Sequence, residues 1–344
     1  MMRLKRSFIM LAVVLFSTSL HSPIYCLAAE ITPFEEQWAL EKTEQKSSFL
    51  PSTLELFNER QVVVVSGFIN ELSGPIYRYF YSTVDAVKKD LKMTTTFFLP
   101  KTQRFSKNIA AIYQTVLKAY EKEQKPVILL GHSKGATEIL HTILLHPELI
   151  TENKVDKVLL VQGTIQGCSI LGDNRLRSPL VPLKRFSEQN FEGVECLEPK
   201  FAKEKLDLAF EVFERELVDQ YGEVIGLEKR KLISGKIFYV RSVAESKDLS
   251  LTTRCLLEMA GNNLNDIGPN DGLLLGEEQE DHRIGRELGL IHEDHNAIAV
   301  SSLFGGKSYN DRKAFIRTLV QQAYQAELES LPSAQGLACN VATL

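Results

Sequence analysis

The sequence lacks the features that mark several classes of protein. Only five of its 344 residues are cysteines and no two of them form a C-x-x-C pair, so neither a zinc site nor a dithiol redox motif is indicated. No basic patch dominates and the formal net charge is −4, which does not favour a protein that binds nucleic acid. Internal repeats and low-complexity segments are also absent from the sequence. A globular protein of one large domain or two small ones is therefore expected.

Long hydrophobic runs are scarce, and the one at the N-terminus is too short to span a bilayer comfortably. Residues 1–6 are basic, residues 8–16 are apolar, and small residues follow at Ala28 and Ala29. This order predicts a signal peptide cleaved near Ala28 or Ala29 and hence an exported protein, periplasmic or secreted. A permanent membrane anchor and a lipoprotein signal through Cys26 are the alternatives.

Cleavage of the signal peptide would leave four cysteines, an even number that permits two disulfides in an exported protein. They are Cys168, Cys196, Cys255 and Cys339. Three connectivities are open, and we favour the one that joins Cys168 to Cys196.

Apolar segments alternate with helical patterns through most of the chain. Strands are expected at 62–65, 94–99, 127–130, 158–161 and 236–241. Helices are expected near 75, over about 106–120, from 133 to about 146 and over 313–330. Strands that alternate with helices predict the α/β class, with a doubly wound and mostly parallel sheet.

The alternation is interrupted between about 170 and 232, where no core strand is indicated and an amphipathic helix runs from Phe201 to Tyr221. We expect a helical cap inserted over the sheet, which shapes the substrate site and acts as a lid. Its apolar stripe would suit a lipid substrate, but it would equally suit a face that packs on the core. The predicted division is a signal peptide (1–29), a leader (30–60), the main domain (61–330) and a loose tail (331–344).

The strand at 127–130 is followed at once by a G-x-S-x-G pattern, residues 131–135, and then by a helix. A serine at a sharp strand-to-helix turn exposes its hydroxyl at the top of the sheet, and the glycines allow neighbouring backbone to come close. The helix N-terminus directs unpaired N–H groups and the positive end of its dipole at charge that develops there. We therefore predict Ser133 as a nucleophile rather than part of a structural turn.

A serine nucleophile needs a base, and three of the seven histidines can reach it from downstream segments. We choose His295 because a loop beyond a strand end can approach the serine. His292 would lie on or near the strand itself, and His282 lies in a charged surface segment. His132 is adjacent to Ser133 and is expected to face the other way.

The base needs an orienting carboxylate, and Asp271 lies in the tight turn Gly-Pro-Asn-Asp-Gly at 268–272. The same residues are also common in turns without any catalytic role. Glu245 and Asp248, just past the strand that ends near Arg241, are the alternatives.

The oxyanion needs preorganised N–H donors. One is expected to be the backbone N–H of Lys134, the residue after the nucleophile. The other is expected from Phe68, in the loop after the first strand, whose side chain could also line an acyl pocket. The Lys134 ammonium is expected to be solvated or paired rather than catalytic.

These segments together resemble the α/β-hydrolases, and more narrowly the bacterial secreted lipases of that fold. The resemblance covers most of residues 60–320 and rests on 62–68, 131–135, 270–273, 294–295 and, after the fourth strand, 161–169. The sequence departs from the lipases at Ser66-Gly67, where they usually have His-Gly, and at Leu273–Leu275, where they have valine and proline. No Ca²⁺ ligand set can be picked out.

The resemblance and the predicted triad Ser133, Asp271 and His295 imply a lipase-like or esterase-like hydrolase of carboxylic esters that works through an acyl-enzyme. We expect a small-molecule or lipid ester as substrate, contact with a lipid interface, and no cofactor or metal. The same triad would serve a phospholipase or an acyltransferase. A non-catalytic relative used as a binding protein is the alternative from another class.

Overall fold

One parallel sheet of six strands organises the molecule. The computed structural model describes residues 34–43, 57–67, 81–99, 105–169, 198–244, 249, 253, 269–299 and 307–329. The strands are β1 (Gln61–Val65), β2 (Thr94–Phe98), β3 (Val127–His132), β4 (Val155–Val161), β5 (Ile237–Ser242) and β6 (Arg286–Ile291). Their order in the sheet is β2-β1-β3-β4-β5-β6, and every neighbouring pair is parallel. The predicted fold class is confirmed.

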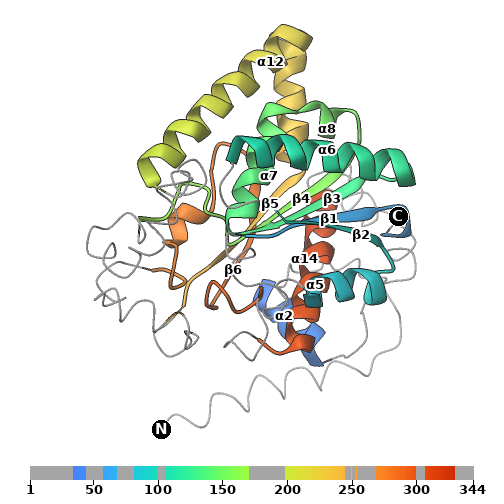
Figure 1. Cartoon of the computed structure of the whole chain (residues 1–344), viewed down its shortest axis with the longest axis vertical. Coiled ribbons are helices and arrows are strands. Elements are labelled where there is room, and N and C mark those ends of the chain that lie inside the picture. Colours follow the sequence, from blue (N-terminus) through green and yellow to red (C-terminus); the bar gives the residue numbers. More distant parts are fainter. Residues whose placement is uncertain are drawn as a thin grey trace, which may run out of the picture.

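Helices cover both faces of this sheet (Figure 1). One face carries α6 (Phe105–Glu123), α7 (Lys134–Leu145), α8 (Glu148–Thr151) and α12 (Pro199–Ser234). The other face carries α2 (Phe34–Thr43), α5 (Tyr81–Asp85), the π-helix η2 (Ala86–Asp90) and α14 (Tyr309–Glu329). A short 3₁₀ helix, η4 (Gly276–Gln279), lies in the long connection between β5 and β6. The closing helix α14 begins at residue 309, earlier than the predicted 313.

The central strands are apolar along their whole length because both faces of the sheet are buried. In β1, Val62 and Val64 face the cluster of buried side chains around α14, whereas Val63 and Val65 face the cluster around α7. The edge strand β2 is only partly buried and carries three threonines. Alternate residues of one strand therefore belong to two separate cores.

The apolar stripe of α12 packs on the core. Leu206, Phe210, Phe213 and Leu217 are buried in the same cluster as the inward face of α7. The helix is interrupted at Gly222, which has a φ of +76°, and its two arms meet at a bend in Figure 1. The sequence left open whether this stripe binds a lipid substrate or packs on the core, and these four residues pack on the core. Residues 170–197 lie outside the described residues, so a lid remains a prediction.

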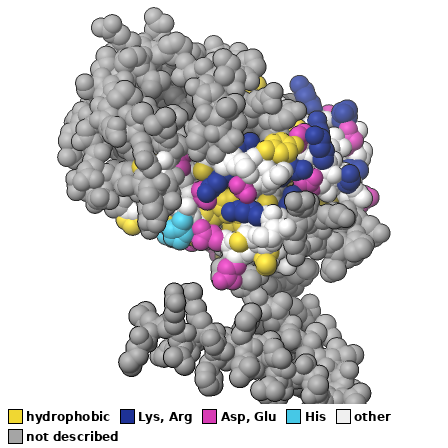
Figure 2. Space-filling view, turned by 90° about the horizontal axis from the view of Figure 1, so that it is seen from below, with side chains coloured by type: hydrophobic (Ala, Val, Ile, Leu, Met, Phe, Trp, Pro, Cys, Tyr) yellow, Lys and Arg dark blue, Asp and Glu magenta, His cyan; other side chains and the backbone are white. Residues whose placement is uncertain are grey.

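The described part of the leader, α2, lies against α14. The Trp38 indole N–H donates to the Asp311 backbone oxygen at 2.9 Å, and the Phe34 and Phe315 rings are 5.5 Å apart. Figure 2 shows the molecule from below the view of Figure 1. On this face, basic, acidic and hydrophobic side chains are mixed over the described part of the surface. The predicted signal peptide and tail lie outside the described residues. Among the helices of the described segments, none has the length and apolar character needed to span a membrane.

The predicted site residues gather at the carboxyl ends of the strands. The chain runs from β1 outward to β2 and then returns to β3 on the other side of β1. In open parallel sheets, ligands bind beyond the carboxyl ends near such a reversal. Ser133 follows β3 directly, Ser242 ends β5, and His295 follows β6. The topology therefore brings segments distant in sequence to one edge.

Candidate active site

Ser133 occupies a strained turn between β3 and α7. Its φ is +55° and its ψ is −130°, a conformation that residues with a side chain rarely adopt. The turn is fixed by its backbone N–H, which donates to the Val161 oxygen at 3.1 Å, and the side chain is 8% exposed. This is the geometry predicted for a nucleophile at the start of a helix.

The two glycines of the motif allow the close packing of this turn. A Cβ on Gly131 would lie 2.8 Å from the Cα of Ala136, in the first turn of α7. A Cβ on Gly135 would lie 2.5 Å from the backbone oxygen of Ser66 at the end of β1. Both distances are shorter than a carbon atom tolerates, so α7 can begin here only with glycine at these positions.

Asp271 and His295 form a buried pair at the same edge of the sheet. The His295 Nδ1 lies 2.8 Å from Asp271 Oδ2, and the His295 backbone N–H donates to the Asp271 backbone oxygen at 2.9 Å. Asp271 is fully buried and His295 is 3% exposed. Because a carboxylate only accepts, Nδ1 carries the proton and Nε2 is left as the basic nitrogen.

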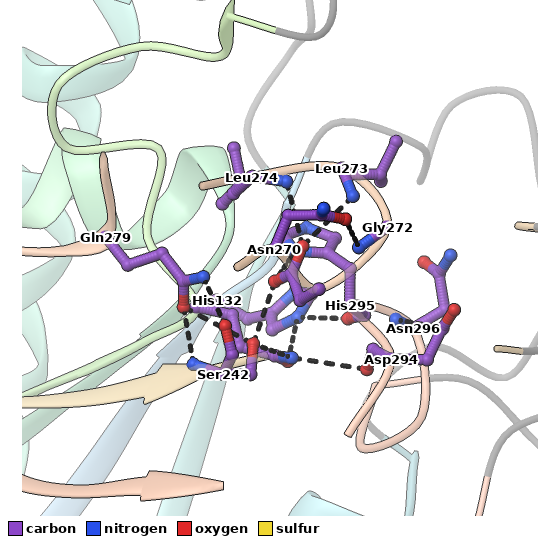
Figure 3. A network of polar contacts seen from close by, with 12 residues as sticks. His132, Ser242, Asn270, Gly272, Leu273, Leu274, Gln279, Asp294, His295 and Asn296 are labelled. Carbon is purple, nitrogen blue, oxygen red and sulfur yellow. Dashed lines mark hydrogen bonds and ion pairs between the residues drawn. The ribbon is translucent and has the colours of Figure 1, made fainter. Parts of the chain in front are cut away.

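The carboxylate of Asp271 is held by three further hydrogen bonds, whose donors Ser242, Leu273 and Leu274 are labelled in Figure 3. Its Oδ1 accepts from the backbone N–H groups of Leu273 at 3.0 Å and Leu274 at 2.8 Å. Its Oδ2 accepts from the Ser242 hydroxyl at 2.8 Å. The turn chemistry that competed with a catalytic role for Asp271 is therefore what orients its carboxylate toward His295.

Ser133 and His295 both lie beyond the carboxyl ends of strands but are not bonded to each other. Among the described residues, no hydrogen bond joins the Ser133 hydroxyl to the His295 imidazole. The link between them is His132, the residue before Ser133, whose ring centroid lies 4.9 Å from that of His295. Contacts between a nucleophile and its base are often longer without substrate and shorten when it binds.

The prediction that His132 faces away from the site is wrong. Its Nε2 lies 3.0 Å from both the Gln162 Oε1 and the His295 backbone oxygen. His132 continues the alternation of β3 and lies on the α14 side, where the loop that carries His295 also packs. Burial and the nearby His295 lower the pKa of His132 to about 3, so its ring is neutral.

Lys134 has a paired ammonium, one of the two predicted alternatives. The ammonium binds the Glu138 carboxylate, which also accepts from Asn108 Nδ2 at 2.7 Å. Burial raises the pKa of Glu138 although the Lys134 charge opposes this. As the first residue of α7, Lys134 has a backbone N–H that finds no acceptor among the described residues. The other predicted donor, Phe68, lies outside the described residues.

The competing histidines lie elsewhere on the surface. The His292 side chain is 58% exposed and contacts Glu35 of α2 at 3.1 Å. The His282 side chain is 82% exposed and lies 3.8 Å from Glu280. Neither contacts Asp271 in the described part of the chain, so the geometry favours His295. The competing acids, Glu245 and Asp248, lie outside the described residues.

Cys168 is a buried thiol whose Sγ donates to the Leu273 backbone oxygen at 2.8 Å. This differs from the disulfide with Cys196 that we favoured from the sequence, and Cys196 itself lies outside the described residues. In the described segments no three or more His, Cys, Asp or Glu side chains are grouped to hold a metal ion.

Comparisons with known proteins show the fold. No family model matches the sequence, and no curated protein is similar to it. A solved metagenomic carboxyl esterase is 19% identical, and the alignment covers 78% of this chain and 76% of the esterase with a TM-score of 0.54. A mature Bacillus licheniformis lipase is 17% identical, over 68% of this chain and 84% of the lipase, with a TM-score of 0.45. The chain has the α/β-hydrolase fold.

Proposed function

We propose that the protein is a serine hydrolase of carboxylic esters. The observation that carries the proposal is the buried hydrogen bond between Asp271 and His295, at the sheet edge where Ser133 begins α7. In this mechanism Ser133 Oγ attacks the ester carbonyl carbon while His295 Nε2 takes the hydroxyl proton. The proton then passes to the departing alcohol, which leaves an acyl-enzyme. Water attacks this ester in the same way and releases the acid and Ser133.

Each supporting group has one task in this proposal. Asp271 keeps the proton on His295 Nδ1 and stabilises the imidazolium that forms during each transfer. The backbone N–H of Lys134 and the helix dipole of α7 stabilise the oxyanion, and Phe68 supplies the second N–H. The paired Lys134 ammonium takes no part, because it is held by Glu138.

The substrate class follows from fold and chemistry together. A carboxyl esterase shares this fold, which supports a small-molecule or lipid ester as substrate. We propose further that the protein is exported after cleavage near Ala28 or Ala29. Sequencing the N-terminus of the mature protein tests this, because a first residue at or before residue 10 would contradict it.

Covalent labelling with a fluorophosphonate tests the proposed nucleophile. We expect one label on Ser133, found by mass spectrometry of the labelled peptide, and no label in S133A or H295A. H292A is the matched control, because it removes the same side chain from an exposed position, and it should label at the rate of the unmodified protein. A label elsewhere, or an equal loss in H292A and H295A, would contradict the assignment.

A series of p-nitrophenyl esters of increasing acyl length then defines the substrate. Hydrolysis that depends on Ser133 supports the esterase function, and the preferred length describes the acyl site. Product analysis with an added alcohol distinguishes hydrolysis from transfer, because a transferase would release the alkyl ester instead of the acid.

A further inference from the structure

Five residues of the site are joined in a closed ring of hydrogen bonds. Three of them, His132, Ser242 and His295, are labelled in Figure 3. His295 and Ser242 both donate to Asp271 Oδ2, each at 2.8 Å. Gln162 Nε2 donates to the Ser242 hydroxyl oxygen at 2.7 Å, and Gln162 Oε1 lies 3.0 Å from His132 Nε2. The ring closes where His132 Nε2 approaches the backbone oxygen of His295 at 3.0 Å.

The partners in this ring fix the position of each proton. Gln162 Nε2 also contacts the backbone oxygen of Asp294 at 3.2 Å, and a carbonyl oxygen only accepts, so the orientation of the amide is settled. Gln162 Oε1 therefore accepts, and His132 carries its proton on Nε2, from which it donates to two oxygens. Because Ser242 accepts from Gln162, its own proton is left to donate, and Asp271 Oδ2 at 2.8 Å is a closer acceptor than Gln279 Oε1 at 3.3 Å.

Gln162 is the centre of this arrangement. It is fully buried and lies directly after β4. Its side chain contacts the last residues of β3 and β5, which are His132 and Ser242, and the backbone of Asp294 in the loop before His295. Its φ is +49°, in the left-handed region that a glycine would occupy without strain. A residue with a strained backbone whose side chain bonds three separate segments is typical of a functional position.

The charged and titratable groups around Asp271 and His295 come from three segments. They are His132 at the end of β3, Glu278 on η4 and Asp294 in the loop before His295. Burial raises the pKa of both Glu278 and Asp294, and the Asp271 charge adds to each rise.

We propose that Gln162, Ser242 and His132 are positioning residues, which hold the Asp271 carboxylate and the His295 ring in the orientation for proton transfer from Ser133. The inference rests on the proposed hydrolase function and extends it. Through Ser242, Gln162 sets the direction of the carboxylate. Through His132 and the Asp294 backbone, it sets the position of the loop that carries His295.

The variant Q162M tests the proposal, because methionine has nearly the same length but cannot donate or accept. We expect kcat for a p-nitrophenyl ester to fall about 10²-fold, as for a displaced catalytic group, with KM within about twofold of the unmodified value. The pH at half-maximal kcat/KM should also shift. Q166M is the matched control and should keep kcat within about twofold, since among the described residues the Gln166 side-chain amide donates to the backbone oxygens of Glu277 and Glu280 and to no member of the ring.

A second readout does not depend on activity. In ¹⁵N-histidine NMR spectra of the unmodified protein, His132 should carry its proton on Nε2 and His295 on Nδ1, and Q162M should lose the protected His132 signal. A proton on Nδ1 of His132 would overturn the ring whatever the variants do. S242A replaces Q162M if that variant does not fold, with the same expected loss of kcat.

The two proposals fail in different ways. If the unmodified protein does not react with a fluorophosphonate but shows the predicted histidine protons, the ring exists and the hydrolase function is wrong. If it reacts at Ser133, and Q162M and S242A react equally fast, the positioning role is wrong. Equal losses in Q162M and Q166M would also overturn it, because a general disturbance of the loop would then explain both.

Discussion

Different chemistry holds the two ends of the strands. We call the end where the strands finish the carboxyl edge of the sheet, and the end where they begin the amino edge. At the carboxyl edge, Asp271 is the one charged member of a ring of amide, hydroxyl and imidazole groups. At the amino edge, a dense ionic cluster centres on Asp156. The Asp156 carboxylate accepts from Arg60 at 2.6 Å, Lys157 at 2.8 Å, Lys236 at 3.2 Å and Tyr324 at 2.6 Å.

Several ion pairs are concentrated at the amino edge, around the buried Asp156. Burial opposes the ionisation of Asp156, but the Lys157 charge and the hydrogen bonds from Lys157, Tyr324 and Arg60 outweigh it and lower its pKa. Glu327 on α14 adds a second carboxylate that pairs with both Lys157 and Lys236. The amino edge therefore has several replaceable ion pairs that join the strands to α14. The carboxyl edge instead has one buried carboxylate, which hydroxyl, imidazole and backbone N–H donors hold.

The largest expected effect is on the carboxyl edge. D271N should lower kcat/KM about 10⁴-fold, about 5.5 kcal/mol of transition-state stabilisation, because the amide favours the wrong tautomer of His295. D219N makes the same change at an exposed position of α12 and should leave kcat/KM unchanged. Ester hydrolysis assays measure both. A D271N variant with more than a tenth of the normal rate would show that the edge tolerates loss of its charge.

The next effect is on the amino edge. D156N should lower the free energy of unfolding by about 3–5 kcal/mol, because the buried Lys157 loses one of its two counter-charges and Arg60 loses the Asp156 charge as well. Urea unfolding measures the loss, and activity per folded molecule should not change. If D156N also lowered kcat, the two edges would be coupled through the strands and the contrast would fail.

The edges should also respond to acid in different ranges of pH. Unfolded His132 takes up a proton as the pH falls below about 6.5, whereas folded His132 stays neutral down to about pH 3. Stability is therefore lost as the pH falls through this window, by about 1.4 kcal/mol per unit at most. H132Q should reduce this slope between pH 6 and 4, as measured by urea unfolding at each pH. The Asp156 contribution is lost only below about pH 4, since its folded pKa lies below the unfolded value. An unchanged slope in H132Q would show that His132 is already charged in the folded protein.

The smallest effect is expected when one of the four donors to Asp156 is removed. K236M should cost about 1 kcal/mol, because Arg60, Lys157 and Tyr324 still satisfy Asp156. Thermal unfolding at pH 7 measures this. A loss as large as that of D156N would mean that the cluster acts as one unit rather than as replaceable pairs.

Sequence alone predicted what depends on local pattern. The apolar strands, the turn at Ser133 and the helix after it follow from neighbouring residues, and the structure contains all of them. The pairing of Asp271 with His295 spans 24 residues, and each residue was predicted from its place in a turn or in a loop beyond a strand and from the chemistry that a serine nucleophile requires. The apolar stripe of α12 was visible, but periodicity does not say whether a stripe meets a core or a ligand.

The ring was missed for a physical reason. The partners of Gln162 lie 30, 80 and 132 residues away, and a neutral amide or hydroxyl carries no pattern that marks it. His132 was placed on the wrong side because its neighbour Ser133 was used as the reference, although the positive φ of Ser133 ends the alternation of β3. The available signal was position: His132 and Ser242 end strands and Gln162 follows one, at the edge that carries the site.

The contact between Gly135 and the Ser66 backbone oxygen has a practical consequence for engineering. The start of α7 and the end of β1 form a corner that no side chain can enter, so a mutant library that randomises this position would return only glycine among active clones. Attempts to widen the substrate range therefore need to leave this corner intact.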